Sequence, residues 1–346
     1  MSKIKKEVIT NNYALYNGDC YEVMKTLPAN SIDLSVYSPP FAKESGGLYQ
    51  YSSDERDLSN CESRDLFMQQ YEFMVAEISR ITKPGRITAV HCTDIMNGRT
   101  ESLNDFPHEI IKIHEKYGFE YKNRITIWKE PMKVRLRTMV KSLMHVSLIE
   151  DATSVFPAMP DYLLLFKKSG ECEVPVTHEG GFKEYFGEIP MLPHMIKGDS
   201  DSDEFLELST KTFQYYQKKY AHFEGDHKEN ILSHIIFRRY MSSVWDDVRI
   251  DNVLPFQDSK DQDDEKHVHP LQLDVIDRVV ALYTNPGEVV LTPFMGVGSE
   301  VYSPVSLGRK AIGIELKDSY FKQAVLNVKD AERRFNEKKP LELDLK

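Results

Sequence analysis

Short apolar runs alternate with longer segments of helical periodicity along most of this 346-residue chain. Runs such as 32–37 and 86–92 have the length of buried strands, while 64–82 places apolar residues three and four positions apart, as a helix does. This alternation predicts an α/β fold with a doubly wound, mostly parallel sheet and helices on both faces. Further strands are expected at 125–128, 162–166, 288–292 and 311–315, and further helices at 106–117 and 271–283.

One long segment interrupts the alternation. Residues 169–240 are acidic around 199–207, then become aromatic and basic, and they show no strand–helix pattern. We interpret 169–240 as a subdomain inserted into one larger domain. The larger domain then consists of two parts, 1–168 and 241–330, and is followed by a charged tail at 331–346.

The charge of the chain is unevenly distributed. Its 44 basic and 54 acidic residues give a net charge of −10, which by itself disfavours a nucleic-acid binder. The stretch 122–141, however, holds seven basic residues and a single acid, Glu130. Such a run is either a solvated helix face or a contact with a polyanion. The candidates for that contact are Lys129, Lys133, Arg135, Arg137 and Lys141, together with Arg238 and Arg239, which could instead pair with the neighbouring acids.

Other sequence features disfavour several classes of protein. No run of 18 apolar residues is present, so no membrane-spanning segment is expected, and the first residues lack the apolar core of a secretory signal. The four cysteines are scattered without a CxxC motif, which indicates reduced thiols in a cytoplasmic protein. His267 and His269 lack a third ligand at suitable spacing, so we expect no metal site.

A glycine-containing loop follows one of the expected strands. The sequence TPFMGVGS spans 292–299, between a strand and a helix. Gly296 and Gly298 allow the backbone to turn tightly and approach a ligand. Glu315 lies 17 residues after Gly298, at the end of the next strand, where its carboxylate can accept both hydroxyls of a ribose. This arrangement indicates a nucleoside cofactor, and Val301 in place of the third glycine of a dinucleotide fingerprint disfavours a nicotinamide.

A second motif, Ser38-Pro39-Pro40-Phe41, ends the strand at 32–37. Two successive prolines remove two backbone donors and stiffen the chain. The Ser38 hydroxyl and the Pro39 carbonyl then form a fixed pair of acceptors that suits the exocyclic amino group of a base. Phe41 offers a face on which that base can stack. The structural alternative is a rigid turn closed by an aromatic side chain.

Together, these residues resemble the amino-methyltransferases of DNA, which methylate N6 of adenine or N4 of cytosine from S-adenosylmethionine. The tetrad of that family is [DNS]-P-P-[YFW], and its cofactor loop is similar to DPFxGxG. Here the tetrad precedes the loop, as in the circularly permuted β group, and the chain looks most like the orphan enzymes of phages and prophages. The segments 17–20 and 269–272 also resemble family segments, and the resemblance extends over 13–167 and 240–330.

The resemblance implies a Rossmann-like class I methyltransferase fold in which the insert 169–240 recognises the target. It implies that S-adenosylmethionine is bound by Asp19, Thr292, Pro293, Phe294, Gly296, Gly298, Ser299 and Glu315. It also implies a base flipped out of double-stranded DNA, S-adenosylhomocysteine as the product, and catalysis by Ser38, Pro39, Pro40 and Phe41. Thr292 stands where the family usually has an aspartate, so the partner of the cofactor's ammonium group stays open.

The sequence leaves several alternatives. A leading serine is commoner in N4-cytosine enzymes and a leading aspartate in adenine enzymes, and the two targets stay nearly even. A methyltransferase acting on RNA or on protein glutamine is a second class, although those enzymes normally place the glycine loop before the tetrad. A non-catalytic DNA-binding relative is the third. A homodimer and a cognate restriction nuclease are left open, and we expect the protein in the cytoplasm of a bacterial or phage-infected cell.

Overall fold

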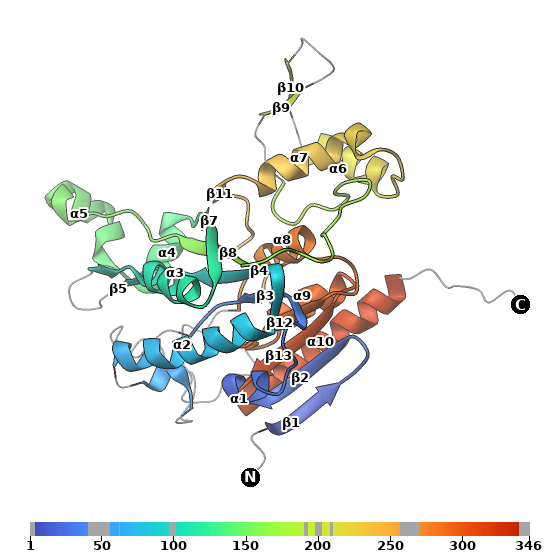
Figure 1. Ribbon diagram of the computed structural model, residues 1–346. Coiled ribbons are helices and arrows are strands. Elements are labelled where there is room, and N and C mark those ends of the chain that lie inside the picture. The colour runs from blue at the N-terminus through green and yellow to red at the C-terminus, as the bar shows by residue number, and fades with distance from the viewer. Residues whose placement is uncertain are drawn as a thin grey trace, which may run out of the picture.

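The structure is a computed structural model in which a large α/β body carries a smaller, mainly helical lobe (Figure 1). It describes residues 4–40, 56–61, 63–96, 102–189, 193–197, 203–207, 210–256 and 270–338. Within these ranges, no helix combines the length and the apolar character needed to cross a membrane.

A nine-stranded sheet forms the centre of the body, in the order β1-β2-β13-β12-β3-β4-β8-β7-β11. The strands from β2 to β4 in this order are parallel to one another, while β1 and β8 run antiparallel to their neighbours. The expected doubly wound, mostly parallel sheet is therefore confirmed. The strands are β1 (Ile4–Ile9), β2 (Tyr13–Gly18), β3 (Ile32–Tyr37), β4 (Thr82–Cys92), β7 (Phe119–Ile127), β8 (Asp161–Lys168), β11 (Val244–Trp245), β12 (Val289–Thr292) and β13 (Lys310–Glu315).

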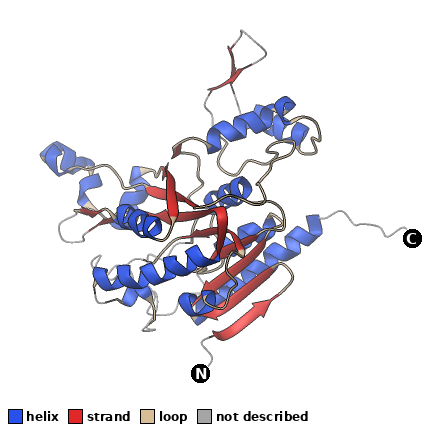
Figure 2. Ribbon diagram, viewed as in Figure 1, coloured by secondary structure: helices blue, strands red, loops and turns tan. Residues whose placement is uncertain are grey.

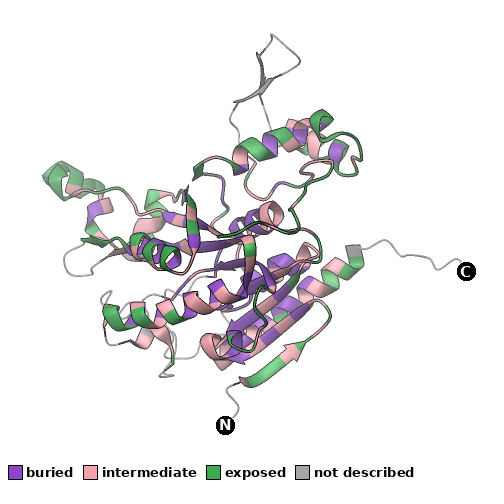
Figure 3. Ribbon diagram, in the orientation of Figure 1, coloured by how far each residue is buried: buried purple, intermediate pink, exposed green. Residues whose placement is uncertain are grey.

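Helices cover both faces of this sheet because successive side chains of each strand point to opposite sides (Figure 2). On β3, Leu34 and Val36 belong to the cluster of α8, whereas Tyr37 packs with α2 and α3. α9 and α10 pack over β2 and β13. The resulting core is buried along the central strands, whereas the edge strand β1 is largely exposed (Figure 3). The helices are α1 (Cys20–Met24), α2 (Arg64–Ile81), α3 (Phe106–Lys116), α8 (Leu273–Tyr283), α9 (Ser299–Ser306) and α10 (Asp318–Lys338).

The first and last parts of the body meet where β2 lies beside β13, one strand in from the edge strand β1. β13 pairs with β2, and Glu315 lies in register with Asn17. The Asn17 side chain donates to the Glu315 carbonyl at 3.0 Å, which fixes the two strand ends. Residues almost 300 positions apart in the chain are thereby adjacent at the carboxyl edge of the sheet.

The segment 169–240 contains elements that the sequence pattern did not predict. They are the hairpin β9 (Pro193–Lys197) and β10 (Asp203–Glu207), followed by α6 (Thr210–Tyr220) and α7 (Ile231–Tyr240). α6 and α7 share their own apolar cluster, which includes Phe213 and Ile236, and Figure 1 shows them in the smaller lobe. The boundaries of an inserted subdomain stay a prediction.

A buried arginine of α8 anchors this lobe to the body. Arg278 has no exposed surface, and its Nη1 donates to Asp247 Oδ1 at 2.8 Å. Its Nε donates to the Phe186 carbonyl at 2.6 Å, and its guanidinium lies over the rings of Tyr240 and Trp245. The contact therefore combines charge, hydrogen bonding and cation–π attraction.

A further extension follows β7. It contains α4 (Pro131–Thr138) and α5 (His145–Glu150), and α5 projects from the side of the body in Figure 1. A short hairpin, β5 (Ile95–Met96) and β6 (Leu103–Asn104), follows β4.

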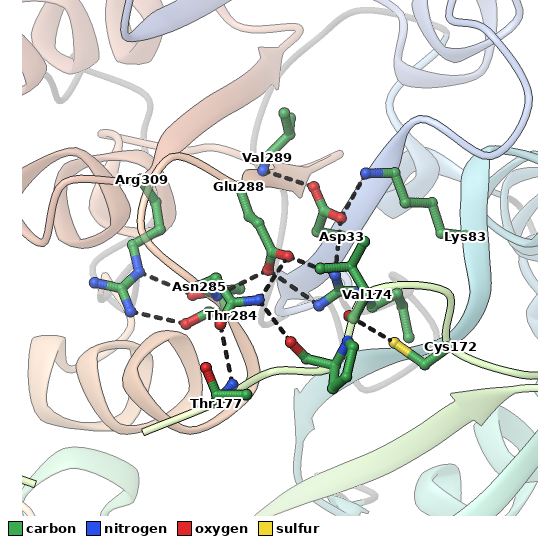
Figure 4. Close-up of polar contacts among 12 residues, drawn as sticks. Asp33, Lys83, Cys172, Val174, Thr177, Thr284, Asn285, Glu288, Val289 and Arg309 are labelled. Carbon is green, nitrogen blue, oxygen red and sulfur yellow. Dashed lines mark hydrogen bonds and ion pairs between the residues drawn. The ribbon is translucent and has the colours of Figure 1, made fainter. Parts of the chain in front are cut away.

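At the amino edge of the sheet, polar side chains pair with one another (Figure 4). Asp33, at the start of β3, accepts from Lys83 Nζ at 2.6 Å and from the Val289 amide at 3.0 Å. Asn285 Oδ1 accepts a hydrogen bond from the Thr177 amide at 3.0 Å, and this bond connects the segment after β8 to the loop before β12. The polar groups named here are therefore paired with one another.

Candidate active site

The opposite, carboxyl edge of the sheet holds a cavity of about 650 Å³. Its wall includes residues at or just after the carboxyl ends of five strands, among them Asp19, Ser38, His91, Pro293 and Glu315. In open α/β sheets, ligands bind in the crevice at the carboxyl ends of the strands, where the strand order reverses. The position of the cavity therefore follows from the topology.

The glycine loop forms one wall of this cavity. Gly296 and Gly298 have φ angles of 53° and 97°, in the left-handed region that favours glycine. Gly298 is also the N-cap of α9, and a Cβ there would lie 3.2 Å from Ala324 Cα. The loop thus turns sharply into a helix, as the sequence predicted, and this helix has no side-chain cap.

Glu315 is held in place by this loop. Its Oε2 accepts the Gly296 amide at 2.8 Å, and its Oε1 accepts the Lys317 amide at 2.7 Å. Burial raises the pKa of Glu315 to about 7, although these hydrogen bonds oppose the shift. Asp19 lines the same cavity and caps α1 by accepting the Glu22 amide at 3.0 Å. The structure thus brings together Asp19, Glu315 and the loop, and their cofactor contacts stay predictions.

Several buried polar groups in this region have no partner among the described residues. Gln272 Oε1 and Ser299 Oγ line the cavity, and Thr292 Oγ1 is buried just behind the loop. Glu300 lines the cavity with only 5 % of its surface exposed, and burial raises its pKa to about 8. Buried polar groups are normally hydrogen-bonded, so the unpartnered atoms at this cavity are suited to hold the polar groups of a ligand.

Glu300 and Gln272 were not among the site residues expected from the sequence. For Glu300, the sequence offered one signal, a carboxylate in the first turn of the helix that follows the glycine loop. An acid is common at that position in any helix, because it interacts favourably with the helix dipole.

The Ser-Pro-Pro segment forms another wall. Ser38, Pro39 and Pro40 line the cavity at the end of β3. The Ser38 hydroxyl donates to the His91 carbonyl at 3.1 Å, and its oxygen lies 3.4 Å from His91 Nδ1. Phe41, which the sequence assigns to base stacking, lies outside the described residues, as do His267 and His269.

Beside Ser38 lies a charged group that sequence reasoning did not find. His91 Nε2 is 3.2 Å from Asp161 Oδ2, and Lys129 Nζ is 2.5 Å from Asp161 Oδ1. Burial opposes ionisation of Asp161, but the charge of Lys129 and the imidazole of His91 hold the pKa of this carboxyl well below its usual range. Lys129 was expected to contact phosphate, whereas its ammonium group lies on Asp161 at the cavity wall.

The other basic candidates lie on the outside of the protein. Lys133 and Lys141 are exposed on and after α4, and Arg135 is partly exposed. Arg238 is exposed on α7, whereas Arg239 pairs with Asp246 and Asp247, as the alternative interpretation foresaw. The side chain of Arg137 lies outside the described residues. Their contacts with phosphate stay predictions.

Comparison with known proteins identifies a family. A family model described as DNA methylase matches residues 32–326. The chain is 23 % identical over 310 residues to the type II methyltransferase M.BglII of Bacillus subtilis, covering 88 % of this chain and 66 % of the relative. It is also 23 % identical to the type II methyltransferase M.BamHI of Bacillus amyloliquefaciens, and the match covers 96 % of this chain and 62 % of the relative. The chain thus spans about two thirds of the length of these two relatives.

A third relative and two solved structures are more similar in length. The DNA adenine methyltransferase YhdJ of Escherichia coli (strain K12) is 28 % identical, with 90 % of this chain and 81 % of the relative covered. TTHA0409 of Thermus thermophilus, a DNA modification methylase by its description, has a structure complexed with S-adenosyl-L-methionine. That structure matches with a TM-score of 0.57 and 18 % identity, and the match covers 93 % of this chain and 96 % of TTHA0409. The cytosine-N4-specific PvuII DNA methyltransferase matches with a TM-score of 0.56, 15 % identity, and 97 % of both chains covered. These likenesses establish a shared fold.

Proposed function

The chain belongs to the DNA methylase family, and from its site we propose that it transfers a methyl group from S-adenosylmethionine to an exocyclic amino group of a DNA base. The observation that carries this proposal is a single cavity with two chemically different ends. One end has the glycine loop and carboxylates that suit a nucleoside with an amino-acid tail. The other has the Ser38 and Pro39 acceptors that suit an amino group.

At the first end, the residues present fit the cofactor. Glu315, fixed by the Gly296 amide, accepts the ribose hydroxyls, and Asp19 lies on the same side for the adenosine part. Thr292 provides no carboxylate for the ammonium group, but Glu300 does. Gln272 Oε1 and Ser299 Oγ are polar atoms without partners that the ligand would satisfy. When bound, the cofactor supplies an electrophilic methyl group on a sulfonium.

At the second end, the chain positions the nucleophile. The lone pair of an aromatic amino group is delocalised into the ring, so the free group is a poor nucleophile. Hydrogen bonds from the amino group to Ser38 Oγ and the Pro39 carbonyl would direct that lone pair towards the methyl donor. Catalysis is then mainly positioning and electrostatics. The base must leave the duplex to reach this cavity, and Phe41 would stack on it.

We assign the DNA contact to the basic residues outside the cavity. Lys133 and Lys141 are exposed on the extension after β7, and Arg238 is exposed on the lobe. Phosphate contacts of this kind fix the register of the duplex but carry little sequence information. The lobe formed by 169–240 is then the part that recognises the target sequence.

The test is an assay of methyl transfer from labelled S-adenosylmethionine to duplex DNA, followed by nucleoside analysis. N6-methyladenine or N4-methylcytosine supports the proposal and also identifies the target base. The matched control is Ser38→Ala, which should bind the cofactor with unchanged affinity in calorimetry and transfer methyl groups more slowly. Label in RNA or in protein glutamine, with none in DNA, would overturn the proposal.

A further inference from the structure

Four side chains from neighbouring elements meet at the cavity wall beside the amino-group acceptors. Ser38 follows β3, His91 lies near the end of β4, Asp161 begins β8, and Lys129 follows β7. Because β8 runs antiparallel to both β4 and β7, its first residue lies at the same edge as their last residues. The resulting order across the wall is Ser38, His91, Asp161, Lys129.

The contacts of His91 determine which of its two ring nitrogens can accept a proton. Asp161 is buried, and Lys129 at 2.5 Å keeps it in its ionised form. The negative charge of this carboxylate, 3.2 Å from Nε2 at ion-pair distance but without hydrogen-bond geometry, favours the tautomer that carries its proton on Nε2. Nδ1 is then left with its lone pair, 3.4 Å from Ser38 Oγ, and the Ser38 hydroxyl, which donates to the His91 carbonyl, can rotate its proton to this lone pair. This arrangement leaves an acceptor next to the hydroxyl that contacts the target.

We propose that His91 accepts, through the Ser38 hydroxyl, the proton that the target amino group must lose, and that Asp161 positions His91 for this step. The inference rests on the proposed function. As the N–CH3 bond forms and the sulfonium–CH3 bond breaks, the amino nitrogen takes on the positive charge. That nitrogen gives one proton to Ser38 Oγ, while the Ser38 proton passes to His91 Nδ1. The products are a neutral methylamino group, an intact Ser38 hydroxyl and an imidazolium beside Asp161.

Lys129 has a defined part in this assignment. Its ammonium group stays on Asp161 and keeps the carboxylate charged, so Asp161 itself takes no proton. Lys129 is therefore a positioning residue, in contrast to the phosphate contact that the sequence suggested.

The decisive measurement is the single-turnover rate of methyl transfer at saturating cofactor. His91→Ala is expected to lower this rate by about 100-fold or more, the usual contribution of general base catalysis. Added imidazole is expected to restore part of the rate in proportion to its unprotonated fraction, because the variant leaves space in the cavity for it. Affinity for the cofactor, measured by calorimetry, is expected to stay within about twofold of wild type.

The pH–rate profile tests Asp161 separately. Asp161→Asn is expected to slow transfer and to move the acid-side midpoint of the profile to lower pH, because an amide no longer stabilises the imidazolium. Among the described residues, Asp161 contacts His91 and Lys129 lies on the other oxygen of Asp161, while Glu300 and Glu315 line the same cavity. Saturating cofactor holds those two carboxylates in one state, so they do not move the midpoint.

Asp33→Asn is the matched control, since it also removes a buried, lysine-paired carboxylate from a strand of this sheet, but at the amino edge. Its rate profile is expected to keep the wild-type midpoint.

The outcomes separate this inference from the proposed function. If wild-type protein methylates no DNA, the proposed function fails. If wild-type protein is active and His91→Ala retains its rate within about threefold, only the role of His91 fails. A slow His91→Ala variant that does not respond to imidazole would likewise overturn proton acceptance and leave His91 a structural residue.

Discussion

Binding of S-adenosylmethionine is expected to release protons, because two buried carboxylates must ionise to hold it. Burial raises the pKa of Glu300 to about 8 and that of Glu315 to about 7. At pH 7, Glu300 is thus about nine-tenths protonated and Glu315 about half protonated. An ammonium group and ribose hydroxyls both favour the charged carboxylate. The expected release is therefore about 1.4 protons for each cofactor bound at pH 7.

The same linkage sets the sign of the pH dependence. A protonated carboxyl must lose its proton before it can hold the ligand, so affinity rises with pH until the free site is ionised. Between pH 6 and pH 7, a group with a pKa near 8 contributes about a tenfold gain in affinity, and one near 7 contributes about fivefold. The cofactor's α-ammonium group remains largely charged in this interval because its ordinary pKa is about 7.7–8.0.

Isothermal titration calorimetry in buffers of different ionisation enthalpy measures the number of protons directly. Glu300→Gln is the matched variant, since it keeps the shape of the side chain and removes its titration. It is expected to release only about 0.5 protons at pH 7 and to lose the tenfold gain between pH 6 and pH 7. Exposed Glu337→Gln should behave as wild type. Binding without proton release, or equal release by wild type and Glu300→Gln, would refute the assignment of the ammonium group to Glu300.

Ser38→Ala is expected to slow methyl transfer and Phe41→Ala to slow it more, with cofactor affinity unchanged; a wild-type rate for Phe41→Ala would contradict base stacking. Arg278→Ala is expected to lower the free energy of unfolding by about 3 kcal/mol in urea titrations, because Arg239 is then the one ionic partner left to the buried Asp247 among the described residues; a loss below about 1 kcal/mol would contradict the anchor. Replacing Lys133, Arg135 and Arg137 with alanine is expected to flatten the slope of log binding constant against log salt concentration by about two to three units, with the sequence preference unchanged. An unchanged slope would show that the basic run 122–141 is a solvated face.

The sequence predicted those parts of the site that depend only on strand ends. Ser38 and Glu315 each follow an apolar run of a parallel sheet, and the carboxyl ends of parallel strands lie at one edge. The meeting of Asp19 and Glu315 followed from the order of the motifs, and β2 beside β13 provides it. In each case, position along the chain was enough to place the residue.

Other site residues depended on information that the pattern does not hold. The apolar run of β8 carries no sign of its direction, and only an antiparallel β8 places Asp161 at the carboxyl edge. At that edge, Asp161 pairs with Lys129 of the basic run, and the Lys129 side chain therefore lies at the cavity wall. Glu300 depended on the rotation of α9 after Gly298, whose φ of 97° lies outside helical values, so helical periodicity could not assign its face.

The two edges of the sheet differ in a way that itself identifies the ligand site. At the amino edge, Asp33 and its neighbours satisfy one another's charges and hydrogen bonds. At the carboxyl edge, Gln272 Oε1, Ser299 Oγ and Thr292 Oγ1 are buried with no partner among the described residues. Burying a polar group without a hydrogen bond costs about 1–3 kcal/mol of folding free energy. A ligand with several polar groups recovers that cost on binding, so the least satisfied edge of this sheet is the one that is built to bind.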